Sequence, residues 1–246
     1  MTSTFSPGNP ASGAGSAILR NVDLRGPAGR LEALLNEGAP QAPCAALVCH
    51  PNPMGGGTMH NKVVYHAMKV LNAPEWGLRL PVLRFNFRGT GLSEGTHDGR
   101  AEAGDVLAAL NWLDNTFKLP VLLAGFSFGA AMALYACCDS QARKQSGAEP
   151  RADACNRVRA IAALGLPTRA DGHHYRYSFI SSCTLPKLFL SGDRDQYAPV
   201  EDLHDVAATT AEPKKIVLLH GADHFFAGQL DAMQNALASW LREQLP

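Results

Sequence analysis

Apolar and polar residues roughly alternate at the start of this 246-residue chain, from 17 to 24 and again from 30 to 35. Such alternation is typical of strands that have one face in solvent. The Gly-Pro-Ala-Gly turn at 26–29 lies between the two segments and favours an antiparallel hairpin. Before the hairpin, residues 1–16 are rich in Ser, Gly and Pro and are expected to form a disordered tail.

After residue 43 the pattern changes to short, continuous apolar runs, which are typical of strands covered by helices on both faces. These runs predict strands at 44–49, 81–87, 120–125, 158–164, 186–190 and 215–219. Apolar residues at helical spacing predict helices at 58–71, 101–117, from the end of the third of these runs to about 138, 199–209 and 226–243. Thr58 is the expected N-cap of the first helix, and the polar residues 139–156 are expected to form a surface connection.

A hairpin followed by repeated strand–helix units predicts an α/β fold. Its central sheet is expected to be mostly parallel, with an N-terminal antiparallel hairpin and helices on both faces. The sequence contains no internal repeat and no second core, so residues 17–246 are predicted to form a single domain.

Composition narrows the class of protein without identifying the chemistry. Hydrophobic residues make up 46% and charged residues 18%, which argues against disorder. Basic and acidic residues are equal at 22 each, so nothing indicates a nucleic-acid or anionic-membrane partner. Neither a membrane-spanning run nor a signal peptide is evident, and a cytoplasmic location is expected. The six cysteines lack metal-ligand spacing and are expected to be small buried thiols in a reducing compartment.

The apolar run at 121–126 leads directly into an Ala-rich helical segment, with Gly-x-Ser-x-Gly at the junction. A sharp turn of this kind holds the hydroxyl of Ser127 clear of the sheet, and Gly125 and Gly129 leave room for neighbouring backbone. The start of the following helix also favours developing negative charge. We predict that Ser127 is a catalytic nucleophile; the alternative is a plain strand-to-helix turn.

A serine hydroxyl needs a base to take its proton and a third group that orients this base. The loop after the strand at 186–190 contains two acids, Asp193 and Asp195. Asp195 lies further out over the end of the sheet, where an imidazole can reach it, and is the predicted acid. Asp193 is the alternative acid and otherwise caps the turn or pairs with Arg194.

The loop after the strand at 215–219 contains two histidines, His220 and His224. His220 ends the strand and is expected to be structural. His224 lies in the loop before the last helix, from which it can reach back to Ser127, and is the predicted base. The adjacent Asp223 is expected to stabilise the start of that helix.

An acyl-transfer site also needs two N–H donors for the oxyanion. Phe128 follows the serine and is predicted to supply the first. In His50-Pro51-Asn52-Pro53 neither proline has an N–H, so Asn52 is predicted to supply the second. His50 is a candidate pocket residue; the alternative is a histidine with a polar partner at the strand end.

The order of these motifs resembles the α/β-hydrolase fold superfamily. A more specific similarity, to a bacterial branch of small, cap-poor predicted serine hydrolases related to the dienelactone-hydrolase-like group, rests on five segments: 50–53, 56–64, 84–89, 124–129 and 223–226. The similarity extends over nearly everything from about residue 17 onward. It implies an α/β-hydrolase fold with a minimal cap or none, a triad of Ser127, Asp195 and His224, and esterase-type activity.

The sequence departs from that branch at three positions. Members often carry His or Leu in place of Asn52, an aromatic residue in place of His97, and Gly in place of Ala101. These positions lie on pocket or flanking loops, so the departures concern the choice of substrate rather than the chemistry.

The interpretation that follows is a serine hydrolase that cleaves small carboxylic esters or thioesters through an acyl-enzyme. Two alternatives remain open: the same scaffold with another reaction type, such as a perhydrolase or a lyase, and a non-catalytic binding module. The expected partner is a small-molecule substrate, with no cofactor, metal, nucleic acid or membrane, and the protein is expected to be a monomer or homodimer.

The segment from 167 to 185 occupies the place of a lid in such enzymes and is too short for a capping domain. Its aromatic residues either form one wall of a shallow pocket or pack on the edge of the sheet. Arg176 is a candidate pocket residue that would pair with a carboxylate on the substrate. Because little apolar surface is available to bury a long acyl chain, short acyl groups are expected to be preferred.

Overall fold

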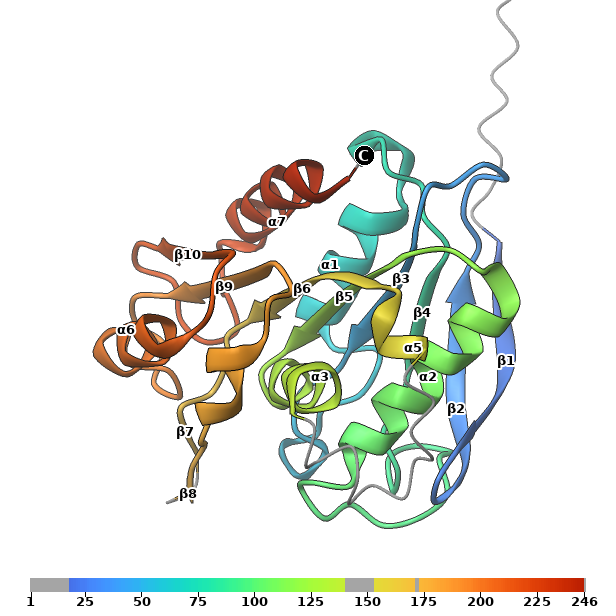
Figure 1. Ribbon diagram of the computed structural model, residues 1–246, viewed down its shortest axis with the longest axis horizontal. Coiled ribbons are helices and arrows are strands. Elements are labelled where there is room, and N and C mark those ends of the chain that lie inside the picture. The colour runs from blue at the N-terminus through green and yellow to red at the C-terminus, as the bar shows by residue number, and fades with distance from the viewer. Residues whose placement is uncertain (1–17, 140–152, 171–172, 246) are drawn as a thin grey trace, which may run out of the picture.

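The computed structural model describes residues 18–139, 153–170 and 173–245. The tail expected at 1–16 and most of the connection expected at 139–156 lie outside the described residues. The central element is an eight-stranded sheet with the order β1-β2-β4-β3-β5-β6-β9-β10. The blue N-terminal hairpin forms one edge of this sheet, and the orange and red strands form the other (Figure 1).

The hairpin and the parallel strands follow the two hydrophobic patterns. The antiparallel pair is β1 (Leu19–Gly26) and β2 (Gly29–Asn36), and β2 also pairs antiparallel with β4. The remaining pairings within this eight-stranded sheet are parallel, between β3 (Ala45–Cys49), β4 (Val82–Phe85), β5 (Val121–Phe126), β6 (Val158–Leu164), β9 (Lys187–Gly192) and β10 (Lys214–Leu219). The predicted fold class is therefore confirmed.

Helices cover both faces of the sheet, and each face has its own apolar core. The helices on one face are α1 (Lys62–Asn72) and α7 (Leu230–Gln244), and those on the other are α2 (Glu102–Phe117), α3 (Phe128–Cys138) and α6 (Val200–Thr209). Strand β3 shows why its run is continuous: Leu47 and Cys49 face α2 and α3, whereas Ala46 and Val48 face α1. Each fully buried Val, Leu or Phe contributes about 1.5–3 kcal/mol to stability.

Two predicted helix starts are wrong. Asn61, not Thr58, caps α1: its side chain accepts the N–H of Val63 at 2.9 Å. Residues 58–61 form a turn instead, because the N–H of Asn61 bonds to the carbonyl of Thr58 at 2.9 Å. Helix α7 begins at Leu230 rather than 226. The carboxylate of Asp223 accepts N–H groups within the preceding loop and stabilises a turn there, not the helix start.

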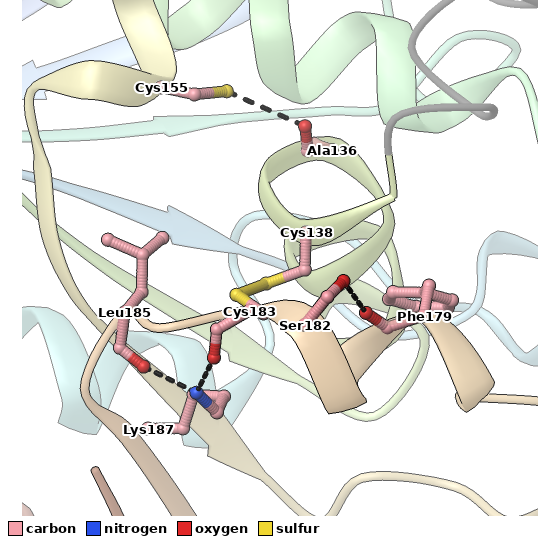
Figure 2. The surroundings of a disulfide bond; sticks show 8 residues. All are labelled: Ala136, Cys138, Cys155, Phe179, Ser182, Cys183, Leu185 and Lys187. Carbon is pink, nitrogen blue, oxygen red and sulfur yellow. Dashed lines mark hydrogen bonds between the residues drawn. A yellow bond between two sulfur atoms is a disulfide. The ribbon is translucent and has the colours of Figure 1, made fainter. Parts of the chain in front are cut away.

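The cysteine prediction is wrong for Cys138 and Cys183, which form a disulfide (Figure 2). Cys138 is the last residue of α3, and Cys183 follows the short helix η3 (Ser178–Ser182). Packing of η3 against the end of α3 brings their Cα atoms to 5.2 Å, within the range that a disulfide spans, and sequence spacing does not reveal this approach. Beside the bond, the buried amine of Lys187 donates to the carbonyls of Cys183 and Leu185 (Figure 2).

The connection between β6 and β9 has no room for a capping domain. Its described residues contain only β7 (Arg169–Ala170), β8 (His173–His174) and η3, so the prediction of a minimal cap is confirmed. The aromatic residues pack against α3: the ring of Phe179 lies 4.8 Å from that of Tyr135, and the hydroxyl of buried Tyr177 donates to the carbonyl of Pro167. The other short helices within the described residues are η1 (Pro53–Gly55), η2 (Pro74–Trp76) and α5 (Asp153–Asn156).

Candidate active site

Ser127 lies at the junction of β5 and α3 in a strained backbone conformation, with φ 54° and ψ −121°. Two close approaches explain the flanking glycines. A Cβ at Gly125 would lie 2.4 Å from the carbonyl oxygen of Gly129. A Cβ at Gly129 would lie 2.5 Å from the carbonyl oxygens of Cys49 and His50. The Gly-x-Ser-x-Gly sequence therefore permits the sharp turn that lifts the serine above the sheet.

Three loops at the same end of the sheet bring Ser127, Asp195 and His224 together. The Nε2 atom of His224 lies 2.9 Å from the hydroxyl oxygen of Ser127, and its Nδ1 atom lies 2.8 Å from Oδ2 of Asp195. The side chains of His224 and Asp195 are 3% and 0% exposed. With the ring protonated on Nδ1, Nε2 accepts the serine hydroxyl, which is the arrangement that general-base activation requires.

Backbone and side-chain donors hold the carboxylate of Asp195 in place. Its Oδ1 atom accepts the N–H groups of Tyr197 and Ala198 at 2.9 and 3.1 Å. Its Oδ2 atom accepts the hydroxyl of buried Ser191 at 3.0 Å, in addition to the contact with His224. Ser191 was not predicted from the sequence, although a polar residue at the end of an apolar strand, four positions before the acid, was a visible signal.

Aromatic rings and close backbone contacts confine the imidazole of His224. The rings of Tyr197 and Phe126 lie 4.7 and 5.0 Å from it. The end of β9 also touches the histidine loop, since a Cβ at Gly192 would lie 2.0 Å from the carbonyl oxygen of Ala222. This contact sets the distance between the acid loop and the base loop. Tyr197 was not identified from the sequence.

The two predicted oxyanion donors lie directly after Ser127 in the chain and in the loop that follows β3. Phe128 is the first residue of α3, where backbone N–H groups have no acceptor within the helix. Asn52 begins the η1 turn: its side chain accepts the N–H of Met54 at 3.0 Å, and its carbonyl accepts the N–H groups of Gly55 and Gly57. Neither the N–H of Asn52 nor that of Phe128 donates to another described residue. Both remain available to a substrate oxygen.

His50 is buried and has a structural environment, which is the second of the two alternatives. Its Nδ1 atom lies 2.7 Å from the carbonyl oxygen of Pro51, and its Nε2 atom accepts the N–H of Phe87 at 2.9 Å. Burial lowers the pKa of His50 to about 4, so the ring is neutral at pH 7. The imidazole thereby ties the loop that carries Asn52 to the residues after β4.

Arg176 and Asp193 form their hydrogen bonds with residues other than Ser127. Arg176 is exposed, and the hydrogen bond in which it takes part is the one that its carbonyl accepts from Tyr135. Asp193 pairs with His220 at 2.7 Å and accepts the N–H of Gly221 at 2.7 Å. Pairing with Arg194, one of the predicted roles of Asp193, is therefore replaced by pairing across two loops.

No group of three or more His, Cys, Asp or Glu side chains among the described residues is arranged to hold a metal ion. None of the helices in the described parts of the chain has the length and apolar character needed to cross a membrane.

Comparisons with known proteins extend over most of the chain. A family model described as an alpha/beta hydrolase domain matches residues 55–240. An uncharacterised protein of Rickettsia prowazekii is 34% identical over 229 residues, which cover 89% of this chain and 87% of that protein. The structure of an alpha-beta serine hydrolase homologue from Coxiella burnetii matches 90% of this chain and 97% of its own, with 30% identity and a TM-score of 0.75. An α/β serine hydrolase without a lid from Xanthomonas campestris matches 93% and 95%, with 28% identity and a TM-score of 0.73.

Proposed function

The chain belongs to the alpha/beta hydrolase family, and on that premise we propose that it is a serine hydrolase that cleaves small carboxylic esters or thioesters through an acyl-enzyme. Ser127 is the nucleophile, His224 the base and Asp195 the group that orients it. The observation that carries the proposal is the continuous chain of contacts, 2.9 Å from serine to imidazole and 2.8 Å from imidazole to carboxylate. The serine hydrolases from Coxiella burnetii and Xanthomonas campestris support the same chemistry.

In the first half-reaction, the Ser127 oxygen attacks the substrate carbonyl carbon while Nε2 of His224 takes the hydroxyl proton. The carbonyl oxygen becomes an oxyanion, which accepts the N–H groups of Phe128 and Asn52. Collapse of this intermediate breaks the bond to the alcohol or thiol. The imidazolium returns its proton to that leaving group, and the acyl group remains on Ser127.

In the second half-reaction, a water molecule replaces the departed alcohol. His224 takes one proton from this water as the water oxygen attacks the acyl carbon. The same two N–H groups donate to the new oxyanion. Collapse releases the carboxylic acid and returns the proton to Ser127. Asp195 stabilises the imidazolium in both halves.

The lidless connection between β6 and β9 supports a preference for short acyl groups. Its aromatic residues pack on α3, so they leave little apolar surface to bury a long chain, which would contribute about 0.8 kcal/mol for each CH₂. Specificity, as kcat/KM along nitrophenyl esters from acetate to palmitate, is expected to be highest for the short chains. A maximum beyond about eight carbons would contradict this preference.

The chemistry itself is tested with a fluorophosphonate probe, which reacts with activated serine hydroxyls, followed by peptide mapping. Labelling at Ser127 is expected in the parent protein and absent from Ser127→Ala. The same two proteins are then assayed with nitrophenyl acetate. A parent protein that neither reacts with the probe nor hydrolyses the ester would support the non-catalytic binding module instead.

A further inference from the structure

Ser191 contacts a member of the triad but has no part in the steps of the proposed mechanism. It lies in β9, one residue before the end of that strand, and is 1% exposed. Its hydroxyl donates at 3.0 Å to Oδ2 of Asp195. That oxygen is also the one that lies 2.8 Å from Nδ1 of His224. The serine hydroxyl and the imidazole therefore share one carboxylate oxygen.

We propose that Ser191 is a positioning residue, which fixes the carboxylate of Asp195 and sets how strongly that carboxylate stabilises the protonated form of His224. The inference rests on the proposed function. It assigns Ser191 no contact with the substrate.

Geometry supports the orienting part of this role. The two N–H groups of Tyr197 and Ala198 hold Oδ1, but neither donates to Oδ2, whose contacts are the hydroxyl of Ser191 and the imidazole of His224. The imidazole of His224 gains and then loses a proton in each half-reaction. A donor that does not take part in proton transfer is therefore needed to keep Oδ2 in place. Ser191 supplies that donor from a β-strand, an element more rigid than the loop that carries Asp195.

Electrostatics supports the second part of the role. A hydroxyl that donates to a carboxylate stabilises its negative charge, so less of that charge is available to stabilise a neighbouring imidazolium. Removal of the hydroxyl should therefore make the protonated imidazole more stable. The titratable groups that face the His224 ring are Asp195 and Tyr197, while Asp193 and His220 pair with each other outside the site.

The expected signature is a change in pH dependence as well as in rate. The rate of Ser127 labelling by a fluorophosphonate depends on neutral His224 and is measured from pH 5 to 9, so that no natural substrate is needed. In Ser191→Ala the acidic limb should move upward by roughly half a pH unit to one unit. The labelling rate at the plateau should fall about tenfold, because the carboxylate is held less firmly.

Two further variants separate positioning from packing. Ser191→Thr keeps the hydroxyl and should restore the position of the acidic limb. Ser93→Ala is the matched control: Ser93 is also buried and its hydroxyl donates at 2.6 Å to the carbonyl of Asn86, but it does not contact the triad. This control should leave the acidic limb in place even if it lowers stability.

The outcomes distinguish the two proposals. An acidic limb that does not move in Ser191→Ala, while the parent is labelled at Ser127, would overturn the role of Ser191 and leave the proposed function intact. A limb that moves equally in Ser93→Ala would also overturn it. A parent protein without labelling at Ser127 would overturn the proposed function and the role of Ser191 together.

Discussion

Two carboxylate–imidazole pairs lie side by side at the ends of β9 and β10. Asp195 contacts His224 at 2.8 Å, and Asp193 contacts His220 at 2.7 Å. In both pairs Nδ1 of the histidine faces Oδ2 of the aspartate. Contact distance and atom types therefore do not tell the two pairs apart.

The two pairs differ in their surroundings. The side chains of His224 and Asp195 are 3% and 0% exposed, whereas those of His220 and Asp193 are 95% and 29% exposed. The free nitrogen of His224 lies 2.9 Å from Ser127, and the remaining Asp195 oxygen is held by two backbone N–H groups. Because water competes for an exposed pair, the outer pair contributes little orientation or energy. Burial and a third partner, not the pairing itself, make one of the pairs suited to catalysis.

Replacement of the two histidines is expected to give the largest difference between the buried pair and the exposed pair. We expect His224→Ala and Ser127→Ala each to lower ester turnover on the order of 10⁶-fold, since loss of either member disables proton transfer from the serine. His220→Ala should leave turnover within about twofold, because its ring faces solvent. Turnover of Ser127→Ala within about tenfold of the parent would remove the assignment of the nucleophile.

The acids provide the next largest contrast. Asp195→Asn should reduce kcat about 10⁴-fold, because an amide no longer favours the required tautomer or stabilises the imidazolium. Asp193→Asn should have little effect on kcat. Steady-state kinetics of the two variants on one ester decide the matter, and the reverse ranking would transfer the role of the acid to Asp193.

A third imidazole, that of His50, sharpens the comparison because it is buried and its hydrogen-bond partners among the described residues are backbone groups rather than a carboxylate. Burial lowers its pKa from 6.5 to about 4. The unfolded chain therefore binds the proton more readily, and stability is full above about pH 6.5 and is lost as the pH falls towards 4. The free energy of unfolding lost in this way is roughly 3 kcal/mol, given about 1.36 kcal/mol for each pKa unit.

The measurement is the free energy of unfolding in urea at several pH values. His50→Gln keeps one donor and one acceptor but does not titrate, so it serves as the matched variant. The parent should lose more stability than this variant between pH 6.5 and 4. Parallel curves for the two proteins would show that His50 does not titrate differently on folding.

The smallest expected effect belongs to the exposed pair. The hydrogen bond from the N–H of Gly221, followed by the interaction with His220, lowers the pKa of Asp193. The contribution of ionised Asp193 to the stability of the fold is therefore present above the unfolded pKa of about 3.9. It is lost as the pH falls through the lower pKa of the folded state. In an acid titration followed by circular dichroism, Asp193→Asn should move the unfolding midpoint only slightly, and less still in high salt. A large, salt-insensitive shift would mean that the outer pair matters to stability.

Local sequence patterns determine several features of this protein. Alternation at 17–35 determines a hairpin with one exposed face, and continuous apolar runs determine strands buried on both faces, because side chains alternate across a strand. Gly125 and Gly129 mark the elbow because no other residue fits so close to neighbouring backbone. The order of serine, acid and histidine on later strand-end loops predicts Ser127, Asp195 and His224 as a triad, and the structure places His224 within hydrogen-bond distance of the other two.

Only the tertiary structure decided which partners those residues meet. Asp193 and Asp195 are two positions apart in one loop, yet the side chain of Asp193 is partly exposed beside His220, whereas that of Asp195 is buried against His224. The bond between Cys138 and Cys183 depends on where η3 packs against α3, 45 residues along the chain. The contact of Ser191 with Asp195 depends on the turn after β9, in which the N–H of Asp195 donates to the carbonyl of Gly192. Local patterns fix periodicity and turn sterics, whereas burial and long-range contacts arise only when separate segments pack together.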